Sequence, residues 1–313
     1  MIIDTAIKIL DEAIKQMKDP KFDKELIINY LEYFIAIMKY EQIQEKLRKA
    51  KANNSPEWKK LNGHYFRSNK GGGEWKTYNL PEEWSIGYDL SIGKRLTFNL
   101  KPFAFKHTGL FPEQAANWDW FSSIIEKAVR EEGRTADSDK PVKVLNLFAY
   151  TGGATIAAAA AGARVTHVDA SKGMVGWAKE NAVSSGLGDA PIRWLVDDCK
   201  KFVEREIRRG NKYDGIIMDP PSYGRGPKGE IWKIEEAVYE LIGLAAELLS
   251  EDALFFLVNS YTTGLQPGVL SYMIGSTVVK NFGGKVESSE LGIPVRDSDY
   301  ALPCGAAGRW TSR

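Results

Sequence analysis

The spacing of apolar and polar residues changes along the chain and divides it into three stretches. Up to about residue 52, apolar residues such as Ile3, Ile7 and Leu10 recur every three to four positions, the spacing of an amphipathic helix. The Asp19-Pro20 pair interrupts this pattern, because the residue before a proline is driven out of the helical region. The pattern therefore predicts a helical hairpin over residues 1–52. We expect it to pack on the rest of the protein or on a second copy of the chain, although its basic end, Lys46–Lys51, also suits an RNA-binding arm.

After the hairpin, the spacing changes to an alternation of polar and apolar residues. The segments Trp75–Leu80, Ser85–Leu90 and Arg95–Leu100 have the period of two that short antiparallel strands show. We predict a small β subdomain over residues 53–105.

From residue 106 to residue 313, short apolar runs alternate with longer helical patterns. Runs such as Val142–Leu147, Tyr213–Met218 and Ala253–Val258 indicate buried parallel strands. The alternation predicts an α/β domain with a Rossmann-like, doubly wound, mostly parallel seven-stranded sheet. Ligands of such sheets bind outside the carboxyl ends of the strands.

Composition narrows the classes of protein that remain. Hydrophobic residues make up 43% of the chain and charged residues 27%, which is typical of a soluble globular protein. The net charge of +1 neither requires nor excludes a nucleic-acid partner. We see no signal peptide and no apolar run long enough to cross a bilayer. The two cysteines, Cys199 and Cys304, lack metal-ligand spacing, so we predict no metal site and a reducing, cytoplasmic setting.

Residues 142–171 form the most informative stretch. Gly152 and Gly153 follow its first strand, where the chain must turn sharply into a helix. The small side chains of Ala154–Ala161 allow that helix to lie close to a sheet, and the next strand ends at Asp169. A carboxylate in this place can accept hydrogen bonds from both hydroxyls of a ribose. The alternative is an ordinary β-α-β unit in which the aspartate only caps a strand.

The glycine pattern indicates which nucleoside cofactor suits this unit. A dinucleotide site uses Gly-x-Gly-x-x-Gly to bring backbone N–H groups close to a pyrophosphate. Here Ala149-Tyr150-Thr151-Gly152-Gly153 takes its place. S-adenosylmethionine (SAM) has no phosphate and tolerates a looser turn. The sequence therefore favours SAM, and we expect a nicotinamide cofactor not to bind.

A second motif, Asp219-Pro220-Pro221-Ser222-Tyr223, follows a later buried strand. The two prolines stiffen the backbone and remove N–H donors. A planar base can stack on Tyr223 while it donates hydrogen bonds to Asp219 and to a carbonyl group. The alternative is a rigid turn with a capping aspartate. The next segment, Gly224–Trp232, is either a grip for phosphates and a base through Arg225, Lys228 and Trp232 or a solvated flexible loop.

Together these motifs resemble those of the class I SAM-dependent methyltransferases, and in particular the bacterial branch related to the large-subunit ribosomal RNA methyltransferases. The resemblance rests on the segments Val144–Gly153, Val168–Ser171, Asp197-Asp198 and Asp219–Gly226, with Thr108–Gln114 ahead of them. It extends from about Trp58 to Trp310 and leaves out residues 1–52.

The resemblance implies two sets of site residues. The first would bind SAM, with its methionine end at Phe148, Ala149, Tyr150, Thr151, Gly152 and Gly153, its ribose at Asp169, its adenosine between Ala170 and Ser171, its adenine at Asp198 and Cys199, and a covering loop that includes Thr108 and Gln114. The second would face the methyl acceptor and consists of Asp219, Pro220, Pro221 and Tyr223.

One departure from the wider group concerns the methyl acceptor. Its cytosine-5 methyltransferases carry a nucleophilic cysteine, commonly just after the fifth strand, where this chain has Val258-Asn-Ser-Tyr261. Carbon-5 of a pyrimidine needs activation by a thiolate, whereas a nitrogen does not. We therefore predict direct transfer to a nucleobase nitrogen of RNA, with an oxygen as the alternative acceptor atom and ribosomal RNA as the foremost substrate. Residues 1–52 could form a homo-oligomer or partner contact. The alternatives are a small-molecule or protein methyltransferase and a non-catalytic scaffold that recruits a partner through the hairpin.

Overall fold

The computed structural model describes residues 61–68, 72–103, 107–225, 231–295 and 299–312. The predicted hairpin over residues 1–52 lies outside them. By its internal contacts the chain divides into two units, residues 1–66 with 75–80, and residues 67–74 with 81–313. Strands β1 (Gly63–Arg67) and β2 (Gly73–Thr77) pair into a two-stranded sheet, most of which belongs to the first unit. The domain boundaries predicted at residues 53 and 106 stay a prediction.

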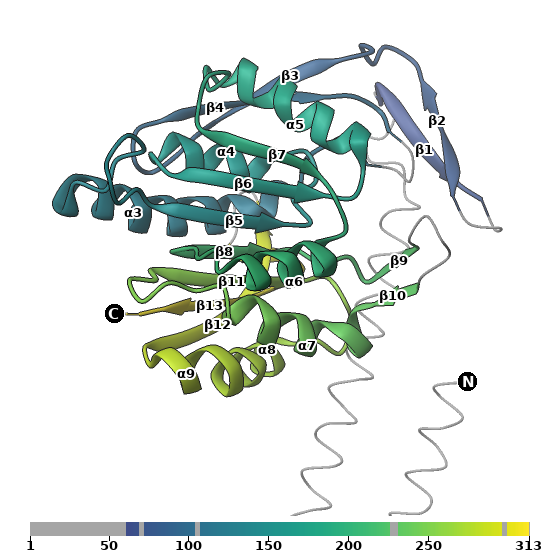
Figure 1. Ribbon diagram of the computed structural model, residues 1–313. Helices are drawn as coiled ribbons and strands as arrows, with labels where there is room; N and C mark the ends of the chain where they lie inside the picture. Colours follow the sequence, from purple (N-terminus) through teal and green to yellow (C-terminus); the bar gives the residue numbers. More distant parts are fainter. Residues whose placement is uncertain (1–60, 69–71, 104–106, 226–230, 296–298, 313) are drawn as a thin grey trace, which may run out of the picture. The chain divides into compact units, whose positions relative to one another are not determined.

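The second unit is built on a seven-stranded sheet with the order β12-β13-β11-β8-β5-β6-β7 (Figure 1). Its strands are β5 (Lys143–Leu147), β6 (Arg164–Asp169), β7 (Ile192–Val196), β8 (Gly215–Met218), β11 (Phe255–Ser260), β12 (Lys285–Pro294) and β13 (Ala301–Thr311). The neighbours from β11 to β7 pair in parallel, and β13 runs antiparallel to both of its neighbours. The predicted mostly parallel seven-stranded sheet is confirmed.

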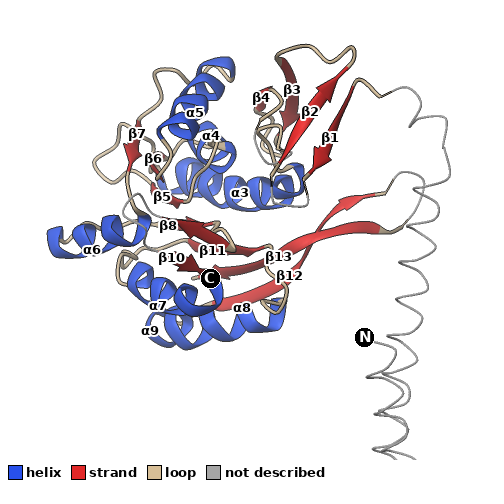
Figure 2. Cartoon of the chain, turned by 90° about the vertical axis from the view of Figure 1, so that its right-hand side faces the viewer, coloured by secondary structure: helices blue, strands red, loops and turns tan. Residues whose placement is uncertain are grey.

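Helices cover both faces of this sheet (Figure 2). One face carries α3 (Ala115–Glu132), α4 (Gly153–Ala160) and α5 (Lys172–Ser184), and the other carries α6 (Cys199–Arg209), α7 (Ile234–Ala246), α8 (Pro267–Ile274), a π-helical turn (Gly275–Val279) and α9 (Lys280–Phe282). The pleat of the strands explains the two faces, because successive side chains point to opposite sides. In β8, Ile216 and Met218 pack in the core with α6 and α7, whereas Ile217 packs in the core with α3 and α4.

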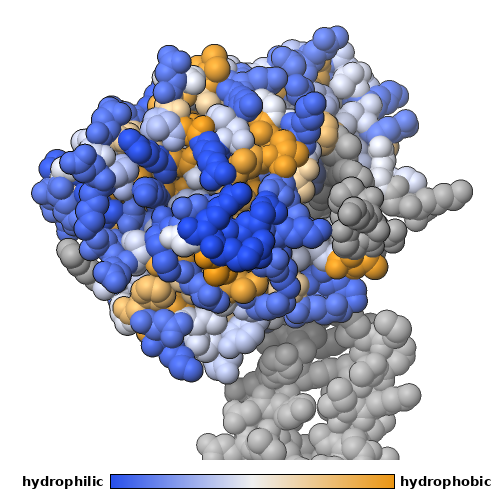
Figure 3. Space-filling view, in the orientation of Figure 1, coloured by the Kyte–Doolittle hydropathy of each residue, from blue (hydrophilic) through white to orange (hydrophobic). Residues whose placement is uncertain are grey.

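Helix α6 shows how the layers meet solvent. Phe202 and Val203 are fully buried, while Arg208 and Arg209 in its last turn are exposed. The face of the molecule turned to the viewer in Figure 1 is accordingly mostly hydrophilic (Figure 3). Within the described residues, no helix is long and apolar enough to cross a membrane.

The hairpin of β3 (Trp84–Asp89) and β4 (Arg95–Leu100) packs beside α5. Side chains of α5 and its C-cap satisfy backbone groups of β4: Ser185 Oγ accepts from Thr97 N at 2.9 Å, and Asn181 Oδ1 accepts from Asn99 N at 2.8 Å. An unpaired strand edge is thereby covered. The strands predicted over residues 85–90 and 95–100 are confirmed.

The segment after Tyr223 contains two short strands. Strands β9 (Tyr223–Arg225) and β10 (Ile231–Lys233) pair antiparallel, and the choice between a phosphate grip and a flexible loop stays a prediction. The indole Nε1 of Trp232 donates a 2.7 Å hydrogen bond to the carbonyl of Pro221. Trp232 therefore belongs to a strand, and α7 begins two residues later, at Ile234.

Candidate active site

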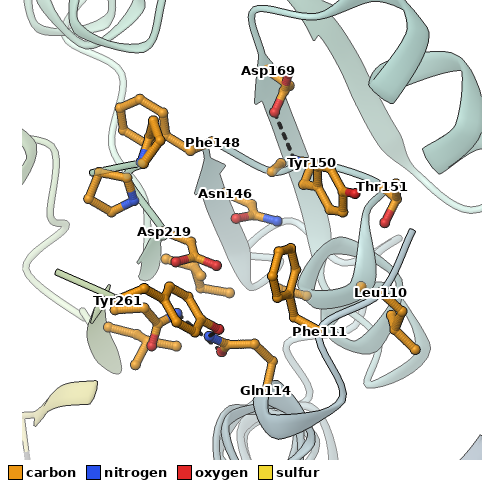
Figure 4. A pocket seen from close by; sticks show the side chains of 18 of the residues that line it. Leu110, Phe111, Gln114, Asn146, Phe148, Tyr150, Thr151, Asp169, Asp219 and Tyr261 are labelled. Atoms are coloured by element: carbon orange, nitrogen blue, oxygen red, sulfur yellow. Dashed lines mark hydrogen bonds between the residues drawn. The ribbon is translucent and has the colours of Figure 1, made fainter. Parts of the chain in front are cut away.

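A cavity of about 560 Å³ opens at the carboxyl ends of the central strands. The chain passes from β5 to β6 and β7 in one direction, and β8 then lies on the other side of β5. Such a switch point leaves a crevice between the loops that leave the two neighbouring strands. The lining comes from the loops after β5, β6, β8 and β11 and from the 3₁₀ turn η3 (Pro112–Gln114) ahead of α3 (Figure 4). The volume is typical of a small-molecule site.

The loop after β5 has an unusual backbone. Phe148 and Tyr150 have φ angles of 56° and 50°, values that cost side-chain-bearing residues about 1–3 kcal/mol each. Hydrogen bonds hold the loop in this shape: Tyr150 N donates to Asp169 Oδ2 at 2.8 Å, and Thr151 Oγ1 donates to the carbonyl of Gly109 at 2.6 Å. The loop is thus preorganised around the cavity.

Asp169 ends β6 and lines the cavity. Its two carboxylate oxygens accept hydrogen bonds from the backbone N–H groups of Tyr150 and Ser171, both at 2.8 Å. Burial raises the pKa of Asp169, and these two hydrogen bonds act in the opposite direction. Each oxygen keeps a lone pair, so the carboxylate can accept two further hydrogen bonds from a ligand.

Asn146 reaches the cavity from β5 and is held from behind. Its Nδ2 donates to Thr155 Oγ1 at 2.9 Å, and that hydroxyl lies 2.9 Å from His167 Nδ1. The Thr155 proton is then directed at His167, which acts as an acceptor. Burial lowers the pKa of His167 to about 3, so His167 is a neutral structural residue.

Asp219 stands directly after β8, and its half-buried side chain lines the cavity. Burial raises its pKa to about 7, with a further contribution from the nearby carboxylate of Glu113. From the described residues, no side chain donates a hydrogen bond to the Asp219 carboxylate. The carboxyl group is thus available to a ligand and can take up or release a proton near neutral pH.

Tyr261 follows β11 and faces the same part of the cavity (Figure 4). Its hydroxyl oxygen accepts from Gln114 Nε2 at 2.7 Å, and the hydroxyl is also hydrogen-bonded to Glu113. Burial, with Asp219 as the next cause, raises the pKa of Tyr261 well above its ordinary value. Tyr261 therefore stays protonated and donates to Glu113.

A buried amide network supports Gln114. Asn117 Nδ2 donates to Gln114 Oε1 at 2.8 Å and to Asn259 Oδ1 at 3.0 Å. Arg309 Nε in β13 donates to Asn117 Oδ1 at 2.8 Å. The orientation of Gln114 is thus fixed by residues from α3, β11 and β13.

Most of the residues predicted for the site do line this cavity. They are Gln114, Phe148, Ala149, Tyr150, Thr151, Gly153, Asp169, Ala170, Asp219, Pro220 and Pro221. Thr108, Gly152, Ser171, Asp198, Cys199 and Tyr223 belong to the described residues but do not line it.

Several of these six residues have a structural role. Ser171 and Asp198 are the N-caps of α5 and α6, and Gly152, with φ 84°, makes the turn into α4. Cys199 is buried, and its sulfur accepts from Phe148 N at 3.2 Å. Tyr223 lies in β9 with half of its side chain exposed.

The sequence did not single out Glu113, Asn146, Asn259 or Tyr261. Asn259 and Tyr261 stand at the end of the fifth parallel strand, which had drawn notice only because it lacks a cysteine. The rule that ligands meet the carboxyl ends of strands was enough to mark them as candidates. Glu113 has no comparable signal, because its nearness to Asp219 depends on the tertiary fold.

The fold and the cavity define a nucleoside-binding α/β enzyme. Residues 39–251, more than half of the chain, match the family described as S-adenosylmethionine-dependent methyltransferase, and the chain belongs to that family. Its structure is similar to that of a SAM-dependent methyltransferase from Agrobacterium tumefaciens, with a TM-score of 0.71 and 36% identity over 83% of this chain and 80% of the other. A putative methyltransferase in complex with SAH has the same fold, with a TM-score of 0.56 and 22% identity over 89% of this chain and 67% of the other.

Two curated relatives are each named ribosomal RNA large subunit methyltransferase K/L. The protein from Shewanella frigidimarina is 35% identical over 126 residues, 40% of this chain and 17% of the relative. The protein from Cellvibrio japonicus is 30% identical over 197 residues, 62% of this chain and 24% of the relative. The matches thus span about a fifth of the length of these relatives.

The enzyme is a methyltransferase whose cofactor is SAM, and the cavity suits that cofactor. Tyr150 lines the cavity, and its hydroxyl is buried and has no hydrogen-bond partner among the described residues. A buried polar atom without a partner is costly, and a polar group of a bound ligand can satisfy it. Asp169 offers acceptors for ribose hydroxyls in the same cavity. Within the described residues, no group of His, Cys, Asp and Glu side chains could hold a metal ion.

Proposed function

We propose that this enzyme methylates a nucleobase nitrogen in RNA, with ribosomal RNA as the first candidate, by direct transfer without a cysteine nucleophile. The observation that carries the proposal is the Asp219 carboxyl group, which lines the cavity without a protein hydrogen-bond donor from the described residues and has a pKa of about 7. The name of the curated relatives, ribosomal RNA large subunit methyltransferase K/L, supports RNA as the substrate.

The cofactor in this proposal lies between the loops after β5 and β6. Asp169 holds the ribose hydroxyls, and Phe148–Thr151 surround the methionine part. The buried hydroxyl of Tyr150 supports this placement, because it has no hydrogen-bond partner among the described residues and a polar group of the cofactor can supply one. Asp198 and Cys199 beside the adenine, and Thr108 in the covering loop, remain candidates of lower rank because they do not line the cavity.

The acceptor in this proposal lies between Asp219 and the aromatic side chains opposite. The ring of Phe111 stands 5.5 Å from that of Tyr150 and 5.7 Å from that of Tyr261, measured between centroids. Such rings offer flat faces to a planar base. The Pro220-Pro221 corner keeps the chain stiff where the base enters.

The chemistry needs orientation and a proton acceptor from the protein. Bound SAM supplies an electrophilic methyl group. The residues around the cavity hold the acceptor nitrogen in line with that group, exclude water and cut the entropic cost of the encounter. The nitrogen loses a proton once it is methylated, and Asp219 accepts it, because a pKa near 7 suits proton transfer at neutral pH.

The positions of the two thiols support transfer without a cysteine. Cys199 is buried, and burial raises the pKa of its thiol far above the ordinary value. The Sγ of Cys304 is 3.4 Å from the carbonyl of Leu302, and burial raises the pKa of this thiol as well. Both cysteines are among the described residues, and neither lines the cavity.

The test is transfer of tritium from methyl-labelled SAM into separated RNA, protein and metabolite fractions. We expect label in RNA, and digestion of that RNA should yield a nucleoside methylated on a ring or exocyclic nitrogen. Asp219→Asn should lower incorporation by at least about a hundredfold, the size of a lost general base. Asp189→Asn, an exposed carboxylate before β7, is the matched control and should leave incorporation unchanged. Label confined to metabolites or protein would refute RNA as the substrate, and label on carbon-5 of a pyrimidine would refute the nitrogen.

A further inference from the structure

A second cavity, of about 270 Å³, opens at the amino ends of the neighbouring strands β5, β6 and β7 (Figure 1). The candidate active site lies at the carboxyl ends of the central strands. Arg164 begins β6 and lines the second cavity, whereas Asp169 ends β6 and lines the first. Five residue steps along a strand cover about 16 Å, so a ligand of the second cavity would not touch the cofactor.

Basic side chains surround this second cavity. Four of its ten lining residues are Lys or Arg and one is an acid, in a chain whose net charge is only +1. All four cations are exposed, and they are Lys143, Arg164, Arg193 and Lys212. This concentration of positive charge creates a local potential that attracts anions.

Two of these cations face each other across the sheet. Lys143 in β5 is the register partner of Arg164 in β6, and like charges in facing positions repel. Among the described residues, neither side chain forms an ion pair, and Arg164 only donates from Nε to the carbonyl of Ala136 at 2.6 Å. The Asp214 carboxylate, which accepts from Lys143 N, is paired with Arg134 at 2.8 Å. The described residues therefore leave the repulsion uncompensated, and a bound anion would relieve it.

The one acid of the cavity, Glu206, is balanced by its own contacts. Its side chain is fully buried, and its Oε1 accepts from Arg209 at 3.0 Å. Its Oε2 accepts from Asn211 at 2.9 Å and from the Tyr213 hydroxyl at 2.7 Å. Arg193 Nη1 lies 3.9 Å from Oε1. The charge of Glu206 is thus neutralised in the floor of the cavity, and the positive charge around the opening stays in excess.

The number and kind of these cations select the ligand. The guanidinium groups of Arg164 and Arg193 carry forked donors that match oxyanions, and the two lysines add point charges. A carboxylate brings one charge and two oxygens to four cations, whereas a phosphate monoester brings up to two charges and three acceptor oxygens. We propose that this cavity is a binding site for a phosphate group, separate from the active site and formed by Lys143, Arg164, Arg193 and Lys212.

The first test is thermal unfolding in low-millimolar potassium phosphate, compared with potassium chloride at the same ionic strength. Phosphate should raise the melting temperature of the wild type in a saturable way, because a ligand that binds only the folded state stabilises it. Lys143→Gln and Arg164→Gln should each lose at least about half of this rise, since each removes one of the four cations. Lys127→Gln, an exposed cation on α3, is the matched control and should keep all of it. Since every variant meets the same salts, the general stabilising effect of phosphate ions cancels from the comparison.

Stability without phosphate separates a ligand site from a merely structural role. In phosphate-free buffer, Lys143→Gln should be at least as stable as the wild type, because the change ends the repulsion with Arg164. A structural role of Lys143 would make the variant less stable in both buffers and leave the phosphate-induced rise unchanged. Equal rises in the wild type, Lys143→Gln and Arg164→Gln would overturn the phosphate site, and so would a wild type that does not respond to phosphate.

The second test identifies the source of the phosphate group, which is either a small phosphate ester or the backbone of RNA. Fluorescence anisotropy measures the affinity for a short, labelled single-stranded RNA over a range of salt concentrations. If the RNA backbone occupies the site, the double variant Lys143→Gln, Arg164→Gln should bind RNA more weakly. Its slope of log affinity against log salt should also be shallower by about one for each cation removed.

The other outcomes of this second test are equally distinct. An unchanged slope, together with the phosphate-induced rise of the wild type, upholds the site for a small phosphate ester. A wild type that binds no RNA would refute RNA as the substrate of the proposed function and leave the phosphate site standing.

Discussion

The hydroxyl oxygen of Tyr261, after β11, accepts a 2.7 Å hydrogen bond from the side-chain amide of Gln114, 147 residues earlier in the chain. This bond joins the turn ahead of α3 to the end of a central strand. Because the oxygen accepts from Gln114, the Tyr261 proton is directed at Glu113. Two residues of η3 therefore orient the Tyr261 hydroxyl.

Gln114→Leu should therefore loosen the acceptor side of the cavity. The change leaves Tyr261, Asn117 and Asn259 without one hydrogen-bond partner each, and unsatisfied buried groups of this kind cost about 1–3 kcal/mol. We expect a loss of that size in the free energy of unfolding, measured with denaturant, and a lower rate of methyl transfer. Gln266→Leu, an exposed position at the start of α8, should change neither. Wild-type stability in Gln114→Leu would show that the network contributes nothing.

Asp169→Asn should weaken SAM binding. The carboxylate accepts from two backbone N–H groups at 2.8 Å, and an amide can present only one oxygen to them. The loop that holds Tyr150 at φ 50° loses a charge-assisted partner, and the ribose loses an acceptor. We expect a dissociation constant for SAM raised about tenfold to a hundredfold, consistent with one or two such bonds, by calorimetry. Asp189→Asn serves as the control, and equal affinities of the two variants would contradict a role for Asp169.

Gly152, in the loop after β5, and Gly176, within α5, should respond in opposite ways to replacement by alanine. Gly152 has φ 84°, and an added Cβ would lie 2.8 Å from that of Ala178, so Gly152→Ala should destabilise the fold by at least about 1 kcal/mol. Gly176 lies within α5 with open space where a Cβ would be, so Gly176→Ala should stabilise it by about 0.5–1 kcal/mol. Thermal unfolding measures both. A neutral Gly152→Ala would mean that the turn into α4 tolerates a side chain.

Replacing the cysteines should leave methyl transfer in place. Cys199→Ser keeps an acceptor for Phe148 N, and Cys304→Ala removes the thiol near Glu113. The double variant should transfer tritium to RNA at a rate within about threefold of the wild type, because nitrogen acceptors need no thiolate. A rate reduced a thousandfold or more, on the order expected for a lost nucleophile, would contradict direct transfer.

The sequence was sufficient for the elements whose local pattern and place in the sheet agree. The apolar runs of β5, β8 and β11 are buried, and Asp169 and Asp219 stand at their expected strand ends. Most of the site residues that lie in the loops after β5, β6 and β8 could therefore be predicted.

The remaining site residues depend on tertiary contacts that no local pattern records. Tyr223 sits in a β-hairpin instead of lining the cavity, because Trp232 ties β10 to Pro221. Glu113 gains its importance only when η3 brings it next to Asp219 and Tyr261. Asp198 caps α6, accepting from Lys201 N at 2.9 Å, which a sequence motif alone does not distinguish from a ligand contact.

The raised pKa of Asp219 gives activity and stability opposite dependences on pH. Its pKa is about 7 in the folded protein against an ordinary value of 3.8, so the folded state binds a proton more tightly than the unfolded chain. The stabilisation from this proton is fully present below pH 3.8 and is lost as the pH rises through about 7. Methyl transfer needs the ionised carboxylate, so the rate of methyl transfer should rise as the pH passes through about 7.

Asp219→Asn should therefore be more stable than the wild type at pH 8, and this difference in the free energy of unfolding should shrink toward pH 5, although the variant is inactive at both pH values. Denaturant unfolding at pH 5 and pH 8, with Asp189→Asn as the matched control, measures this difference. An advantage that does not change between the two pH values would show that Asp219 ionises at its ordinary pKa and is not poised to accept the proton.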